Sequence, residues 1–122
     1  MEGWISLYRK FVNWEWYTDA NTMRVFLHLL LLANHKENKW RGILIERGQL
    51  VTSYNSISDD LNLTVQEIRT SFKRLKSTNE ITTKSTNKYT LVTILKYNDY
   101  QDNQEENNKQ TNTRNNNQTT SN

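Results

Sequence analysis

Side chains that can donate hydrogen bonds or carry positive charge gather on one side of the stretch 64–77, TVQEIRTSFKRLKS. At about 100° per residue in a helix, this side collects the amide, hydroxyl and cationic groups of Gln66, Thr70, Lys73, Arg74 and Ser77. Arg69, a further candidate DNA-binding residue, and Lys76 flank its boundary. Amides and hydroxyls bind base edges, and cations bind phosphates. The pattern predicts a helix that lies in the major groove of DNA, although a solvated basic face and a membrane-surface segment share its composition.

The other side of this stretch is apolar and predicts how the helix packs. Its apolar residues recur at helical spacing and are Val65, Ile68, Phe72 and Leu75. Thr64 and Glu67 have the spacing of a capping box at its start. A shorter helix is expected before it, because Ser53 is a suitable N-cap and Asn62 tolerates the left-handed backbone that ends a helix. Two helices joined by about three residues predict a helix-turn-helix.

A β-hairpin is expected directly after this pair of helices. Residues 81–85 and 89–96 are rich in β-branched and aromatic side chains, and residues 86–88 supply the turn. The hairpin extends the prediction to a winged helix-turn-helix. Lys84 and Lys88 would then lie on the wing, where they reach phosphates or a minor groove, and they complete the candidate DNA-binding residues.

Positive charge is concentrated in the same region. The whole chain has 16 Lys and Arg against 13 Asp and Glu, which is a net charge of +3. Residues 65–98 alone hold seven basic and two acidic side chains. Because electrostatic steering depends on local potential, this clustering predicts a polyanionic partner, and double-stranded DNA is the partner that suits the helix pair.

The N-terminal part is rich in aromatic and apolar residues. Trp4, Leu7, Phe11 and Trp14 fit one face of a helix, which predicts that they cap a small core. A stacking platform for single-stranded bases is the alternative.

A helix over 20–35 is expected after Asp19 as its N-cap, and its circumference is apolar except for one stripe of Arg24, His28 and His35. A surface of this kind must be covered nearly all round, so we expect self-association into a homo-oligomer unless the N-terminal aromatic residues provide the cover.

Length and composition restrict the remaining possibilities. The 122 residues suit one domain, and the fold class expected is mainly α with a small β-sheet (α+β), including one or two short strands within 42–53. We place the winged-helix domain at 1–98 and a tail at 99–122 that is disordered, or at most loosely docked near Tyr97 and Tyr100, since 17 of its positions are Asn, Gln, Thr or Ser. With no cysteine and no apolar run of membrane length, we expect a cytoplasmic protein that is not associated with a membrane. We expect no cofactor, no metal ion and no enzymatic activity, since no phosphate-binding loop or catalytic set is evident.

Four segments in the same order resemble a known family. These are GWISLYRKF, ANHKEN, RGQLVTS and TNKYTLVTILKYNDYQ, which together extend over residues 3–101. They are similar to the N-terminal winged-helix domain of phage replisome organisers and replication initiators, relatives of the DnaD-like primosomal proteins. The resemblance implies a DNA-binding replication protein that assembles at an origin and helps to recruit the replicative helicase or its loader. It also implies that the protein is associated with the nucleoid of a bacterial host cell. In longer members a polar linker leads to a further C-terminal region, and residues after 101 resemble that linker.

Two other functions use the same physical features. A transcriptional regulator of a phage or mobile element would bind a promoter with the same helix and wing. An adaptor or inhibitor would use the winged-helix scaffold to bind a host protein without contacting DNA. The residues by themselves support nucleic-acid binding and self-association, and replication enters only through the resemblance.

Overall fold

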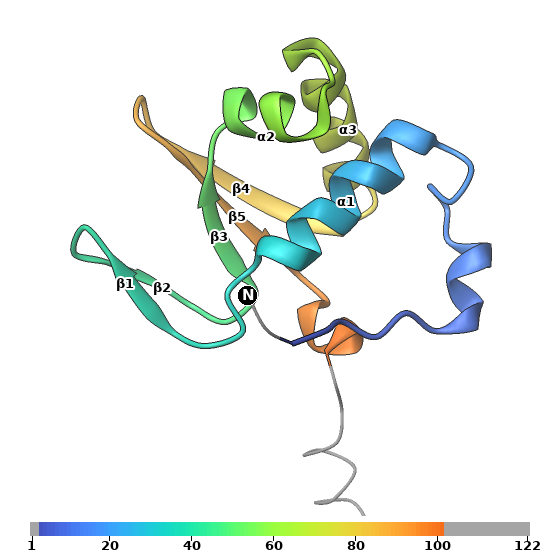
Figure 1. The fold of residues 1–122 in the computed structure, drawn as a ribbon, viewed down its shortest axis with the longest axis horizontal. Helices are drawn as coiled ribbons and strands as arrows, with labels where there is room; N and C mark the ends of the chain where they lie inside the picture. Colours follow the sequence, from blue (N-terminus) through green and yellow to red (C-terminus); the bar gives the residue numbers. More distant parts are fainter. Residues whose placement is uncertain (1–2, 102–122) are drawn as a thin grey trace, which may run out of the picture.

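The computed structural model describes residues 3–101, and these form an α+β fold of three α-helices and two small antiparallel sheets (Figure 1). The helices are α1 (Ala20–Leu32), α2 (Tyr54–Leu61) and α3 (Val65–Ser77). The strands are β1 (Asn38–Trp40), β2 (Ile43–Ile45), β3 (Gln49–Thr52), β4 (Ile81–Ser85) and β5 (Thr90–Ile94). Two short 3-10 helices, η1 (Arg9–Asn13) and η2 (Tyr97–Tyr100), lie near the two ends of the described chain.

Local signals in the sequence set the helix ends. Asp19 and Ser53 accept hydrogen bonds from backbone N–H groups at the starts of α1 and α2. Thr64 and Glu67 form the predicted capping box at the start of α3, with bonds of 2.8 and 3.1 Å. Asn62 closes α2 in the left-handed conformation, with φ of 56°. These predictions are confirmed, as is the short connection between α2 and α3.

Helix α1 is shorter than the expected span of 20–35. It ends at Leu32 because the backbone of Asn34 is hydrogen-bonded to the segment that begins β3. The N–H of Asn34 donates to the carbonyl of Gln49 at 3.0 Å, and its carbonyl accepts from Gly48 at 2.7 Å. The chain therefore leaves the helix to meet the start of β3.

The five strands belong to two separate sheets. Strands β3 and β4 both pair antiparallel with β5, giving the order β3-β5-β4, and β1 pairs with β2 as a hairpin. The stretch 42–53, where one or two strands are expected, holds β2 and β3, one in each sheet. Strand β1 is not predicted by the sequence, because its residues Asn-Lys-Trp include one apolar side chain and give no alternating pattern.

The core lies between the three helices and one face of the β3-β5-β4 sheet. Helix α3 contributes the predicted stripe, of which Ile68, Phe72 and Leu75 are buried. The other buried apolar residues of this cluster are Val25, Phe26, Leu29, Leu30, Ala33, Leu50, Ile57, Ile81, Val92, Ile94 and Tyr97. Within residues 3–101, no helix is long and apolar enough to cross a membrane.

The helical face expected for Trp4, Leu7, Phe11 and Trp14 is not formed, and that prediction is wrong. Only η1 is helical there, and Trp4 and Leu7 are exposed. The rings of Phe11 and Trp14 stack at 5.0 Å, and Trp14 lies 4.8 Å from the ring of Phe26 in α1. Contacts with α1 have overridden the helical periodicity, and the aromatic residues cover one side of α1 within the same chain.

The C-terminal end of the described chain is packed beyond the expected boundary at residue 98. Tyr100 lies 5.5 Å from the ring of Phe26, and its carbonyl accepts from the N–H of Ser6 at 2.6 Å. Ile5 and Gln101 form an isolated antiparallel bridge. The two ends of the domain are thus joined, and the predicted disordered tail lies, from residue 102 onward, outside the described residues.

Candidate nucleic-acid interface

The outward arc of α3 consists of Gln66, Thr70, Lys73 and Ser77. Gln66, Lys73 and Ser77 are exposed, and Thr70 is half-buried. The opposite side of the helix carries the buried stripe, so the arc points away from the core. The side chain of Lys73 has no hydrogen bond or ion pair within residues 3–101. A cation, an amide and hydroxyls are therefore presented together with no acidic side chain on the arc.

Arg69 and Lys76 lie on the flank of α3 between α2 and β4. The guanidinium of Arg69 lies 4.9 Å from the ring centroid of Tyr54 in α2. The Nζ of Lys76 lies 3.4 Å from the hydroxyl of Thr83 in β4. Stacking on an aromatic ring orients a guanidinium and leaves its N–H edge available for hydrogen bonds. Both cations therefore border the outward arc.

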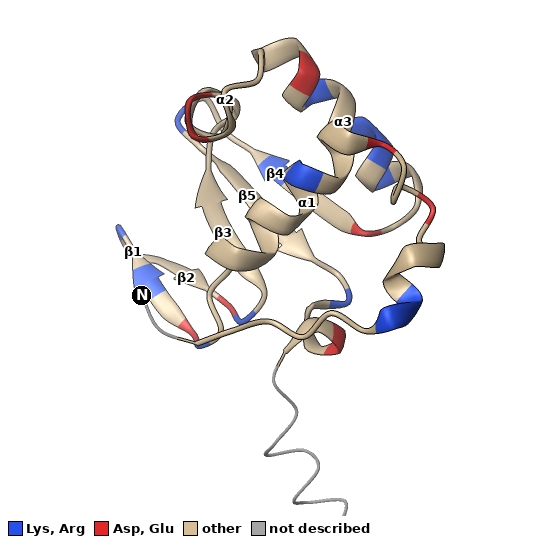
Figure 2. Cartoon of the chain, turned by 45° about the vertical axis from the view of Figure 1, so that its right-hand side comes forward, with Lys and Arg blue, Asp and Glu red and all other residues tan. Residues whose placement is uncertain are grey.

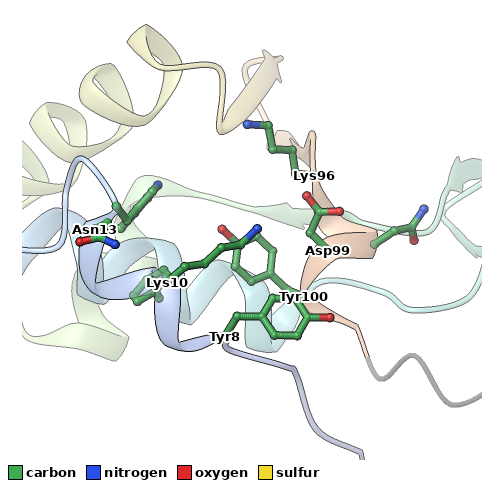
Figure 3. Close-up of a pocket in the computed structure, with 9 residues that line it drawn as sticks. Tyr8, Lys10, Asn13, Lys96, Asp99 and Tyr100 are labelled. Atoms are coloured by element: carbon green, nitrogen blue, oxygen red, sulfur yellow. The ribbon is translucent and has the colours of Figure 1, made fainter. Parts of the chain in front are cut away.

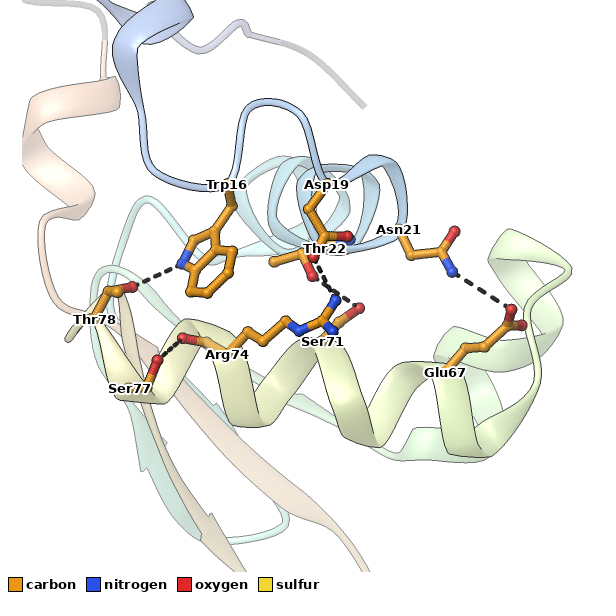
Figure 4. Close-up of polar contacts among 9 residues, drawn as sticks. All are labelled: Trp16, Asp19, Asn21, Thr22, Glu67, Ser71, Arg74, Ser77 and Thr78. Carbon is orange, nitrogen blue, oxygen red and sulfur yellow. Dashed lines mark hydrogen bonds and ion pairs between the residues drawn. The ribbon is translucent and has the colours of Figure 1, made fainter.

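Arg74 lies on the opposite flank and has a partner within the protein. Its guanidinium forms an ion pair with Asp19, the residue that caps α1 (Figure 4). The side chain of Arg74 is 47% exposed and that of Asp19 is 21% exposed, so the pair sits at the surface edge of the interface between α1 and α3. The charge of Arg74 is thereby largely balanced, unlike that of its neighbour Lys73.

This ion pair is part of a polar seam that joins the α1 side of the molecule to α3. The seam has four contacts, visible in Figure 4, and they are Trp16 to Thr78 at 2.9 Å, Asp19 to Arg74, Thr22 to Ser71 at 3.4 Å and Asn21 to Glu67 at 3.4 Å. The α3 members are three or four residues apart and form one stripe. Thr22 and Ser71 are buried, so the seam fixes the rotation of α3 about its own axis.

Two carboxylates of the seam are held in their charged form. Partial burial raises the pKa of Asp19, but hydrogen bonds from Thr22 and the charge of Arg74 outweigh it, and the pKa lies below its ordinary value. Hydrogen bonds from Thr64 lower the pKa of Glu67, with a smaller contribution from Asn21. Both groups are therefore ionised at neutral pH.

The β4–β5 hairpin carries Lys84 and Lys88 at different places. The strand register pairs Thr83 with Val92 and Lys84 with Leu91. Val92 is buried against the helices, so Lys84 projects from the face of the sheet that points away from them. Lys88 lies in the exposed turn, which is closed by a bond of 2.8 Å from the N–H of Thr86 to the carbonyl of Tyr89.

The structure brings some of the predicted site residues together and separates others. Gln66, Thr70, Lys73 and Ser77 share the outward arc, and Arg69 borders it. Arg74 is turned toward α1, and Lys84 projects from the sheet face that points away from the helices. Figure 2 shows Lys and Arg spread along α3 and also present on β4 and β1, whereas α2 carries only acidic charge. The sequence interpretation missed the polar seam, although its polar stripe on α3 is evident from spacing alone.

The two histidines are not joined in a metal site within the described chain. The Nε2 of His28 lies 3.1 Å from Asp60 of α2, and the guanidinium of Arg24 donates to the carbonyl of Leu61 at 2.9 Å. His35 lies beyond the end of α1, and no group of three or more potential metal ligands occurs within residues 3–101. The polar stripe of α1 therefore contacts α2.

A cavity of about 440 Å³ lies between η1 and η2 and includes Lys10, Lys96 and Tyr100 in its lining (Figure 3). Burial raises the pKa of Tyr100 to about 12, and the nearby Glu80 and Asp99 contribute to the rise. The phenol is therefore neutral at physiological pH.

No protein-family model, curated protein or solved structure matches the chain, so the candidate interface rests on its own geometry.

Proposed function

We propose that this protein binds duplex DNA as a winged helix, with α3 in the major groove and the β4–β5 hairpin as the wing. The observation that carries the proposal is the outward arc, where the unpaired Lys73 lies beside Gln66 and Thr70. The polar seam supports it, because a helix with a fixed rotation presents the same side chains to every DNA site.

Membrane binding and single-strand stacking both fit the packing of this domain poorly. A membrane-surface helix must bury its apolar side in lipid, but Ile68, Phe72 and Leu75 are already buried in the core. A single-strand stacking platform needs several free aromatic faces. Trp4 is exposed, but Phe11 and Trp14 stack on each other and Trp14 also contacts Phe26. Duplex DNA suits the exposed polar surface best.

We further propose a role in the initiation of phage-type DNA replication. This part rests on the resemblance of residues 3–101 to replisome organisers, and recruitment of a helicase loader or helicase rests on it as well. Regulation of a promoter is the alternative that uses the same interface. Selection of bound fragments from genomic DNA separates the two, since the enriched fragments would map to an origin in one case and to promoters in the other.

Self-association remains part of the proposal, on a smaller surface than the sequence suggested. The N-terminal aromatic residues cover one side of α1, while Leu31 and Leu32 at its end remain 54% and 38% exposed. Leu44 of the neighbouring β1–β2 hairpin is 47% exposed. A second copy could bury these side chains, and two recognition helices would then act on one DNA molecule.

Salt dependence of duplex binding tests the DNA proposal. If about four or five of the cations on α3, on its flank and on the wing contact phosphates, log affinity should fall with log salt with a slope of about −4. The measurement is fluorescence anisotropy of a labelled duplex between low and physiological salt, with the single strand of the same length as the control. Absence of duplex binding even at low salt would contradict the proposal.

A further inference from the structure

The turn of the β1–β2 hairpin has an unusual residue at its tip. Strand pairing of Trp40 with Ile43 leaves a two-residue loop, in which Arg41 has φ of 50° and Gly42 has φ of 80°. Positive φ at both positions is the requirement of a type I′ turn, for which Asn-Gly is the favoured sequence. Arginine is strained in this left-handed conformation. A side chain placed there against the local preference indicates a use for that side chain.

The side chain of Arg41 is oriented by Trp40 and otherwise unpaired. Its guanidinium lies 5.0 Å from the ring centroid of Trp40, and it has no hydrogen bond or ion pair within residues 3–101. Trp40 in turn contacts Tyr89 of the other hairpin edge to face, with ring centroids 5.3 Å apart. Arg41 is thus fixed in place while its N–H edge stays free to donate.

The contact between Trp40 and Tyr89 places the two hairpin tips next to each other. Figure 1 shows both tips on the same side of the molecule. Lys88 precedes Tyr89 in the turn, and Lys84 projects from the sheet face that also carries Leu91. No acidic residue occurs within 38–45 or 81–93. The two neighbouring hairpins therefore carry basic side chains and no acidic ones within these ranges.

We infer that the β1–β2 hairpin is a second DNA-contacting arm, in which Arg41 binds a backbone phosphate beside those contacted by the β4–β5 hairpin. This inference rests on the proposed duplex binding. An oriented guanidinium binds phosphate through two parallel N–H bonds, which suits the free edge of Arg41. Trp40 acts as a positioning residue, because Arg41 and Tyr89 both contact its ring and it is not a free surface for base stacking.

The variant Arg41→Asn separates the DNA contact from the stability of the turn. It creates the favoured Asn-Gly turn and removes the cation. We expect the full chain with this change to bind duplex about 3- to 10-fold more weakly at about 0.1 M salt, with a salt slope shallower by about 1. We expect its melting temperature to be equal to or above that of the unchanged protein, because the strain at the tip is relieved. The matched control is Lys96→Ala, which removes one exposed cation near η2 and should change neither quantity.

Each outcome of this comparison gives a decision. Weaker binding and a shallower slope with an intact melting temperature support the arm. Affinity and slope equal to those of Lys96→Ala overturn the arm and leave the proposed DNA binding standing. A lower melting temperature, whether affinity changes or not, assigns Arg41 a structural role and overturns the arm as well. If the unchanged protein binds no duplex at all, the proposed function and the arm both fail.

Discussion

Replacing Lys73 and Arg74 by alanine, one at a time, removes the same charge from neighbouring positions of α3. The structure predicts opposite consequences for the two variants. Lys73 is exposed and unpaired within residues 3–101, whereas Arg74 is held by Asp19 at the N-terminus of α1. Lys73→Ala should therefore affect DNA binding, and Arg74→Ala should mainly affect stability.

The stability cost of Arg74→Ala follows from the exposure of the ion pair. Exposed pairs contribute about 0–1 kcal/mol, and hydrogen bonds to charged groups about 1.5–3 kcal/mol. With Arg74 47% exposed and Asp19 21% exposed, we expect about 1 kcal/mol. Asp19 keeps its capping bond from the backbone of Thr22 at 3.1 Å, which limits the loss. For a domain of this size, about 1 kcal/mol lowers Tm by about 4–8 °C.

The cost of Lys73→Ala is expected in the binding assay. A surface substitution without a partner changes stability by about 0.5 kcal/mol at most. Loss of one phosphate contact makes the slope of log affinity against log salt shallower by about 1. At about 0.1 M salt we expect duplex binding about 3- to 10-fold weaker than in the unchanged protein. Arg74→Ala should weaken duplex binding by less than half as much on a logarithmic scale, because the charge of Arg74 is already balanced by Asp19.

The two variants are compared by thermal melting followed by circular dichroism and by anisotropy titration at several salt concentrations. The double variant Asp19→Ala/Arg74→Ala adds a check. Because either single replacement already breaks the ion pair, the double variant should lose less stability than the sum of the two single losses. The contrary result is an Arg74→Ala variant that melts like the unchanged protein and weakens duplex binding as much as Lys73→Ala does. The ion pair would then be absent in solution, and Arg74 would belong to the DNA contact.

Two further predictions concern the apolar end of α1 and the joined termini. Sedimentation at micromolar concentration should show a species heavier than the chain mass of 14.6 kDa, and Leu31→Lys should shift it to monomer without changing the circular dichroism spectrum; a strictly monomeric unchanged protein contradicts this. Tyr100 has its pKa raised to about 12 by burial and by Glu80 and Asp99, so its neutral form stabilises the fold below about pH 10, and this contribution is lost as the pH rises toward 12. Tyr100→Phe should reduce the fall in stability between these pH values, measured by urea denaturation, and an unchanged fall would show that Tyr100 does not cause it.

Local sequence determined the parts of this protein that depend on neighbours along the chain. The N-caps at Asp19, Ser53 and Thr64, the left-handed end at Asn62 and the apolar stripe of α3 all follow from spacings of a few residues. Such signals are readable because a cap or an amphipathic stripe is formed within one or two turns. The β4–β5 hairpin is readable for the same reason, since β-branched residues flank a short polar turn.

Tertiary structure decided what each surface faces. Trp4 and Leu7 have the spacing of a helical face, but contacts with α1 and the joined termini leave η1 as the only helix within residues 3–19. By spacing alone, Arg74 fits the outward side of α3 as well as Lys73 does. Their environments differ only because Asp19, 55 residues away from Arg74 in sequence, forms an ion pair with Arg74. Pairing of Trp40 with Tyr89 likewise joins segments that show no common pattern. These contacts link residues distant in sequence, so their partners are fixed by packing and not by local propensity.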